Sequence, residues 1–418
     1  MPRQDVTSAQ HDVPAFPDHL RGAIQTLRGA IIELLASVGG DPTKPKDLSR
    51  RFKVNKNLTW KISKIVNTTD LYAAVPHIPG SAGFQIFFGA LEKAGADADL
   101  LEDARRAARE FDHVVKVHTG DRATLEIMSS DMLPPPAQSE QHEQSRKLAY
   151  QGNSGTWSVR ARVQLSLNIL APNEKDPEQC DLVQVGGLIG FQRLRRDARW
   201  LLFRRERWTD EAPLEKEDQW EPLDPDSAPG LGVPLIREFC SKPLPEIESI
   251  AAVGEDQYEL PPGPVGNTAA LTCVFGSVIR AVGPVYAEKA GEHSEVGCNL
   301  ITPAEHLVLD LLVHRTFEWA MNPRLVIYSR MDGGAIHTSV RRGRNILAVP
   351  ESVHDLEWGI AGLATTLIPR YPRIAAYAFE RLGWNADDFR AFRLTMQYPP
   401  IPTAVLLQSD LPQRGQAR

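Results

Sequence analysis

Apolar residues near the start of the chain follow a helical period. Successive apolar positions are separated by alternating steps of four and three residues, which places them on one face of an amphipathic helix over residues 19–37. These positions are Leu20, Ile24, Leu27, Ile31 and Leu34. The apolar face must pack on the helices that follow or form the seam of a dimer, and a seam normally extends over roughly three or four heptads.

Helical periodicity continues to about residue 132, so residues 1–133 are predicted to form an all-α domain. The apolar positions of the later helices are Phe84, Phe87, Phe88, Leu91, Leu101, Ala104, Ala108, Phe111 and Val115. Residues 134–146 follow with three successive prolines and a polar stretch, and this composition predicts an extended linker.

Beyond the linker, apolar and polar residues alternate. From Thr156 to Leu170 the period is two, which predicts a strand with one face buried and one face in water. Residues 181–191, 198–208, 267–286 and 324–331 also have strand composition, whereas the acidic, proline-rich residues 209–234 are predicted to form a long surface loop.

Three later segments have helical features. Residues 302–321 begin with a capping-box pattern, and residues 354–368 and 373–384 have helical periodicity. Residues 147–418 are therefore predicted to form an α+β domain with a largely antiparallel sheet.

Composition and charge distinguish one segment from the rest. The 418 residues have a formal net charge of -6, with 42% hydrophobic and 24% charged residues, which are ordinary values for a globular protein. The segment Lys44–Val66, "KPKDLSRRFKVNKNLTWKISKIV", instead carries eight lysines and arginines against one aspartate, a formal charge of +7. Cations gathered in one segment of an acidic protein are typical of a surface that contacts phosphates.

The hydrophobic pattern of this segment predicts two short helices joined by a corner. Leu48 and Phe52 lie on one face of the first helix, and Leu58 and Ile62 lie on one face of the second. Val54 stands at the corner, where its side chain would fill the gap between the helices.

This layout resembles the helix-turn-helix family of bacterial transcriptional regulators. The resemblance is carried by the small Ser49, by apolar Phe52 and Val54, and by Ile62. Lys53 stands at the corner position where the family usually has glycine and where a positive φ is needed. Thr59 stands where an apolar residue normally packs.

The resemblance implies a cytoplasmic DNA-binding protein that regulates transcription as a homodimer, with the second helix in the major groove of double-stranded DNA. Arg50, Arg51 and Lys64 would hold the DNA backbone, while Asn57 could pair with adenine and the lysines with guanine or phosphate. The second-helix residues expected to enter the groove are Asn55, Lys56, Asn57, Trp60 and Lys61. The alternative is a solvated basic helix pair that serves protein packing, with Trp60 folded inward.

Other candidate chemistry is weaker. His306, Asp310 and His314 would line one stripe of the predicted helix over residues 302–321, but the third ligand would lie too far along the axis to share one metal ion. The four cysteines are far apart, and no nucleophile motif is present, so no catalytic residue, metal or cofactor is predicted. The glycines of "VGGLIG" from Val185 lack the dinucleotide-binding order and predict a strand with a bulge.

Two functional questions stay open at this stage. The arginine clusters at residues 193–199, 203–207 and 341–344 form ion pairs at the surface or line a pocket for an anionic effector. The α+β domain senses a ligand or mediates assembly, with an enzyme or a purely structural interaction protein as the alternatives. The N-terminus lacks the apolar run of a signal peptide, and residues 267–286 fall short of a membrane helix, so no membrane association is expected.

Overall fold

The computed structural model describes residues 14–133, 135–206, 220–225, 234–252, 255–331, 343 and 345–414. The chain divides into two compact units, Met1–His142 and Glu143–Arg418. Most of the predicted acidic loop over residues 209–234 and most of the arginine cluster at residues 341–344 lie outside the described residues.

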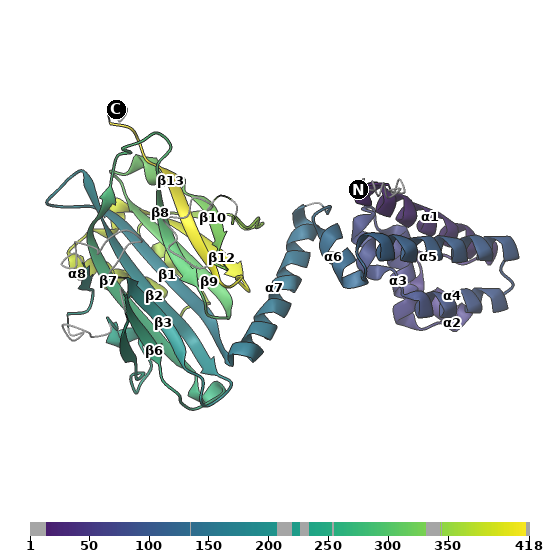
Figure 1. The fold of residues 1–418 in the computed structure, drawn as a ribbon, viewed down its shortest axis with the longest axis horizontal. Coiled ribbons are helices and arrows are strands. Elements are labelled where there is room, and N and C mark those ends of the chain that lie inside the picture. The colour runs from purple at the N-terminus through teal and green to yellow at the C-terminus, as the bar shows by residue number, and fades with distance from the viewer. Residues whose placement is uncertain are drawn as a thin grey trace, which may run out of the picture. The chain divides into compact units, whose positions relative to one another are not determined.

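The N-terminal unit is helical, as predicted. Its elements are α1 (Phe16–Ser37), α2 (Pro45–Phe52), α3 (Lys56–Asn67), the 3-10 helix η1 (Tyr72–His77), α4 (Ser81–Lys93), α5 (Ala98–His118) and α6 (Arg122–Ser130). The five apolar positions predicted for α1 are fully buried, and α1 runs beside α5 (Figure 1). The apolar face of α1 therefore packs within the unit.

The predicted extended linker is wrong, because residues 135–157 form helix α7 (Pro135–Trp157). Pro135 and Pro136 occupy its first two positions, where a backbone N–H has no partner within the helix and the fixed φ of proline suits the first turn. The prolines therefore start this helix instead of preventing it.

A seven-stranded sheet forms the centre of the C-terminal unit. Its strand order is β11-β12-β9-β1-β2-β7-β4. Its strands are β1 (Val159–Pro172), β2 (Gln179–Arg193), β4 (Trp220–Pro222), β7 (Leu271–Pro284), β9 (Ala304–His314), β11 (His354–Trp358) and β12 (Phe389–Gln397). Neighbouring strands are antiparallel except β1 and β9, so the sheet is mixed. The register of β2 on β7 shifts between Leu188 and Phe191, at the place where a bulge was predicted.

Two antiparallel three-stranded sheets and helix α8 (Tyr371–Leu382) are further elements of this unit, which also contains residues 143–157 of α7. The first sheet has the order β10-β13-β8 and the second the order β3-β6-β5. Their strands are β8 (His293–Leu300), β10 (Arg324–Ser329), β13 (Thr403–Asp410), β3 (Trp200–Glu206), β5 (Glu248–Ala252) and β6 (Glu255–Leu260). Helix α8 confirms the helical pattern predicted for residues 373–384.

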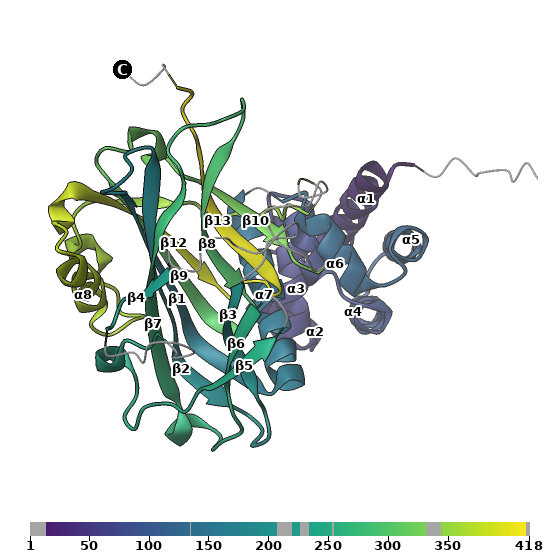
Figure 2. The same cartoon turned by 60° about the vertical axis from the view of Figure 1, so that its left-hand side comes forward.

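Both faces of the central sheet are covered where β1 crosses it. One face of β1 shares a core with α8, while the other packs toward the β10-β13-β8 sheet (Figure 2). Ser166 and Asn168 are consequently buried, and Gln164 Nε2 donates to the carbonyl O of Asn299, at 3.0 Å. The predicted wet face of β1 is therefore wrong along the second half of the strand.

Two predicted helices are also wrong. Residues 304–314 form strand β9, and Thr302, predicted as a helix N-cap, accepts a hydrogen bond from Trp200 Nε1 at 2.9 Å. Residues 354–368 contain β11 and the 3-10 helix η7 (Ala361–Leu363), joined and followed by irregular segments. No helix in the described ranges is long and apolar enough to cross a membrane.

Candidate nucleic-acid interface

Helices α2 and α3 meet at a three-residue corner in the N-terminal unit. Lys53 ends α2 in the left-handed conformation, with φ 52° and ψ 39°, as predicted for the glycine-type position. Val54 is 4% exposed and fills the gap between the helices. Asn55 caps α3, because its side-chain Oδ1 accepts a hydrogen bond from the backbone N of Asn57 at 2.8 Å.

The inward-facing positions of the two helices are those predicted. Leu48, Phe52, Val54 and Ile62 are buried in one core, with Leu58 partly buried against it. Ser49 Oγ donates to the carbonyl O of Val54 at 2.7 Å, so the small side chain at the crossing also ties α2 to the corner.

Thr59 is accommodated inside although it is polar. It is 1% exposed, and its Oγ1 donates to the carbonyl O of Lys56 at 3.1 Å. A buried hydroxyl that bonds to its own helix avoids the free-energy cost of an unpaired polar group. The position therefore behaves as a core position, as it does in the family pattern.

Contacts from outside the hairpin fix the position of α3. Arg28 of α1 donates from Nε to the carbonyl O of Ile65 at 2.8 Å, and its Nη2 donates to the carbonyl O of Thr68. A cation at this end also stabilises the negative C-terminal end of the helix dipole. Ser63 Oγ donates to the carbonyl O of Pro42 at 2.6 Å. No local sequence pattern points to Arg28 or Ser63, because their partners lie 37 and 21 residues away in the chain.

The outward face of α3 carries the predicted polar and cationic residues. Lys56, Asn57 and Lys64 are exposed, Lys61 is half-buried, and Trp60 is 42% exposed. Trp60 therefore does not fold inward, while the alternative of a basic helix pair that serves protein packing stays open. Lys64 Nζ lies 5.6 Å from the centroid of the Trp60 ring, within range of a cation–π contact.

The two arginines of α2 differ in their surroundings. Arg50 is exposed and forms a 3.2 Å ion pair with the exposed Asp47. Arg51 instead donates to the carbonyl O atoms of Val38, at 2.5 Å, and Gly39, at 2.6 Å. Arg51 therefore fastens α2 to the end of α1, whereas Arg50 projects outward.

The charges on α3 are largely unopposed. Lys44 pairs with Asp41 and Arg50 with Asp47, but Lys56, Lys61 and Lys64 form no ion pair with a described residue. These positive charges act on the half-buried His77 at the end of η1. Burial lowers the pKa of His77, and the positive charges of Lys64 and Lys61 lower it further.

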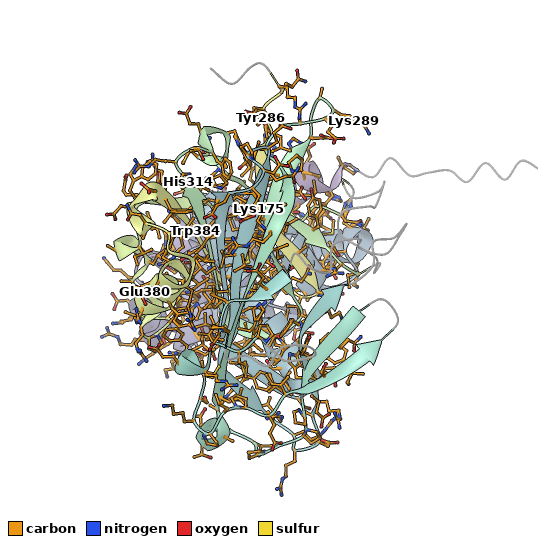
Figure 3. The ribbon with its side chains drawn as sticks, turned by 90° about the vertical axis from the view of Figure 1, so that its left-hand side faces the viewer. Lys175, Tyr286, Lys289, His314, Glu380 and Trp384 are labelled. Atoms are coloured by element: carbon orange, nitrogen blue, oxygen red, sulfur yellow. The ribbon has the colours of Figure 1, made fainter. Side chains whose placement is uncertain are left out.

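The stripe of His306, Asp310 and His314, set aside as a metal site on the sequence, does not lie on a helix. His306, Asp310 and His314 lie on strand β9, so the outer two are separated by eight residues, or about 26 Å at the usual strand rise. Asp310 between them is fully buried, and His314 lies near Trp384 on the side of the sheet that carries α8 (Figure 3). Within the described ranges, no cluster of His, Cys, Asp and Glu could hold a metal ion.

Arginines of the first cluster, residues 193–199, form ion pairs and hydrogen bonds with other groups of the protein. Arg195 pairs with Asp197 at 2.5 Å, and Arg199 pairs with Glu248. Arg193 is buried and donates to the carbonyl O atoms of Ala198 and Pro261. The prediction of surface ion pairs is therefore confirmed for Arg195 and Arg199, while an anionic effector stays a prediction.

Comparison of the chain with known protein families, curated proteins and solved structures finds no match.

Proposed function

We propose that this protein binds double-stranded DNA through α2 and α3 and regulates transcription. The observation that carries the proposal is the outward face of α3, where Lys56, Asn57, Trp60 and Lys64 are exposed while the opposite face is fixed in the core. A helix held this way can enter a major groove without rearranging the unit.

The exposed residues supply the two kinds of contact that groove binding requires. Lys61 and Lys64 attract phosphates, and Arg50 on the preceding helix extends the cationic surface. Asn57 can present both a donor and an acceptor to an adenine edge, since only its backbone N is used in the cap of α3. Arg51 has no such role in the proposal, because its guanidinium is held by Val38 and Gly39.

One short helix buries too little surface for tight, specific binding, so the protein should act as a symmetric dimer on two half-sites. The C-terminal unit would supply ligand sensing or assembly. We assign these separate roles to the two units because the hairpin of α2 and α3 resembles a helix-turn-helix and because the second unit is large.

The test is equilibrium binding of the full-length protein to a fluorescently labelled duplex of mixed sequence, measured by anisotropy over a range of salt concentrations. We expect log K to fall linearly with log salt, as it does when phosphate contacts release counterions. The variant Lys56→Ala/Asn57→Ala/Lys61→Ala should bind about ten- to a hundredfold more weakly, with a salt slope about 2 units shallower if both lysines contact phosphate.

The matched control removes two exposed lysines from the same unit, by Lys93→Ala on α4 and Lys116→Ala on α5. Its affinity should stay within about a factor of two of the wild type, because neither lysine belongs to the proposed contact helices α2 and α3. Equal losses in the two variants, or wild-type binding that salt does not weaken, would show that α3 is not the contact surface.

A further inference from the structure

His77 lies against the outward face of α3 although it belongs to a different element. Its ring meets the Trp60 ring edge-on, with centroids 5.1 Å apart and planes at 76°. The same indole has Lys64 Nζ over its face at 5.6 Å. The half-buried imidazole and the ammonium group therefore share one aromatic side chain on the surface proposed to contact DNA.

The groups around His77 disfavour its protonated form. Burial comes first, because an imidazolium loses hydration there, and the nearby Lys64 and Lys61 repel a positive ring. Helix α6, whose charged residues are Arg122 and Glu126, also packs against η1. The first turn of η1 is capped by Asp70, and Arg21 of α1 lies 5.9 Å from the centroid of its Tyr72 ring. Arg122 donates to the carbonyl O of Ile78, the residue after His77, at 2.6 Å, and its charge is paired with Asp112 at 2.8 Å.

We propose that His77 takes up one proton from solvent when a DNA phosphate binds across Lys61 and Lys64, and that it then acts as a further cation of the interface. This inference rests on the proposed DNA-binding function. A bound phosphate places negative charge beside the two ammonium groups and cancels the repulsion that they exert on a protonated ring. The proton moves to a ring nitrogen, and no covalent bond of the DNA changes.

Proton uptake makes DNA affinity depend on pH in one direction. If the pKa of His77 is higher in the complex than in the free protein, affinity increases as pH falls through the pKa of the complex. The increase ends below the pKa of the free protein, where both states are protonated. A single proton limits the slope to about one logarithmic unit of affinity per pH unit.

The experiment compares binding of the same labelled duplex from about pH 8 to about pH 5.5 at constant ionic strength, the range in which histidine titrates. The wild type should bind about three- to tenfold more tightly at the acidic end through this proton. His77→Gln, which keeps a polar side chain but cannot titrate, should lose that gain. His113→Gln, at an exposed position of α5, should retain it.

A second measurement covers the case in which His77→Gln does not fold. Titration of the His77 ring protons by NMR in the wild type should give a higher pKa with DNA than without it. An unchanged pKa, or equal pH slopes in the wild type and His77→Gln with salt-sensitive binding intact, overturns the proton uptake and leaves the DNA-binding function standing. If the wild type shows no salt-sensitive binding, both proposals fail.

Discussion

Arg393 and Asp310 form a two-point ion pair between neighbouring strands inside the C-terminal unit. Arg393 Nε lies 2.8 Å from Asp310 Oδ1, and Nη2 lies 2.6 Å from Oδ2. Arg393 Nη2 also donates to the carbonyl O of Leu363 at 2.9 Å, and its guanidinium carbon lies 5.4 Å from the centroid of the buried Tyr371 ring. The pair thus joins β9, β12, η7 and α8 in one polar network.

Removing the cation of this pair should destabilise the C-terminal unit strongly. Burial raises the pKa of Asp310, while Arg393 opposes that effect by favouring the carboxylate. Arg393→Met leaves a fully buried carboxyl group without its partner, which should lower the free energy of unfolding by about 3–5 kcal/mol. The measurement is urea-induced unfolding of the full-length protein, with the transition of each unit followed separately.

A neighbouring arginine provides the control for this prediction. Arg390 lies on the same strand and pairs with Asp355 at 2.5 Å, but both side chains are about one-third exposed. Arg390→Met should therefore cost less than about 1 kcal/mol. The double variant Asp310→Leu/Arg393→Met should recover much of the loss, since no buried charge is left unpaired. If the two single arginine variants lose equal stability, the buried pair is not a major contributor.

The same pair shows why the fold of the C-terminal unit was only partly predictable. The segment Leu307–Val313 is apolar at every position except Asp310, and a run of this kind does not distinguish a helix from a strand buried on both faces. The partner that neutralises Asp310 is 83 residues away. The capping-box pattern that begins at Thr302 favours a helix for this segment. In the structure the Thr302 hydroxyl caps no helix and accepts a hydrogen bond from Trp200.

The N-terminal unit was more predictable because its helices each bury a single stripe. The apolar stripe of α1 and the inward and outward positions of α2 and α3 depend on residues only a few positions apart. The groups that complete the candidate site depend instead on residues far apart in the sequence. Arg28 reaches α3 from 37 residues away, and His77 meets Trp60 through the fold of η1, so no local pattern could assign either of them.

One substitution at the corner between α2 and α3 should stabilise the N-terminal unit. Lys53 has a positive φ, which costs a residue with a Cβ roughly 1–2 kcal/mol relative to the right-handed region. Lys53→Gly should raise the stability of the N-terminal unit by about 0.5–1 kcal/mol, after the greater flexibility of glycine in the unfolded chain is subtracted. Thermal unfolding monitored by circular dichroism measures the change.

Lys53→Ala separates backbone strain from charge, because it removes the same ammonium group but keeps the Cβ. We expect no gain in stability from alanine, and an equal weakening of DNA binding in both variants if Lys53 contributes only its charge. A stability gain of the same size in both variants would mean that repulsion among the cations, not the left-handed backbone, was the source.

A histidine pair between α1 and α5 makes the stability of the N-terminal unit sensitive to acid. His19 Nδ1 lies 3.0 Å from His118 Nε2, so this hydrogen bond requires a neutral nitrogen on one of the rings. Burial lowers the pKa of His118 below its usual value, and the neighbouring His19 and His113 lower it further. Glu110 Oε1 lies 3.2 Å from His19 Nε2, on the other side of that ring.

The sign of the pH effect follows from these contacts. Because the pKa of His118 is lower in the folded state, the unfolded chain binds the proton first as pH falls. The stability contribution should be complete above the usual histidine pKa of 6.5 and should be lost as pH falls through the lowered pKa of the folded state. Tm measured at intervals from about pH 8 to about pH 5 should therefore fall more steeply for the wild type than for His118→Gln, whose amide retains hydrogen-bonding capacity without titrating. Identical slopes for the two proteins would contradict a role of His118 in acid sensitivity.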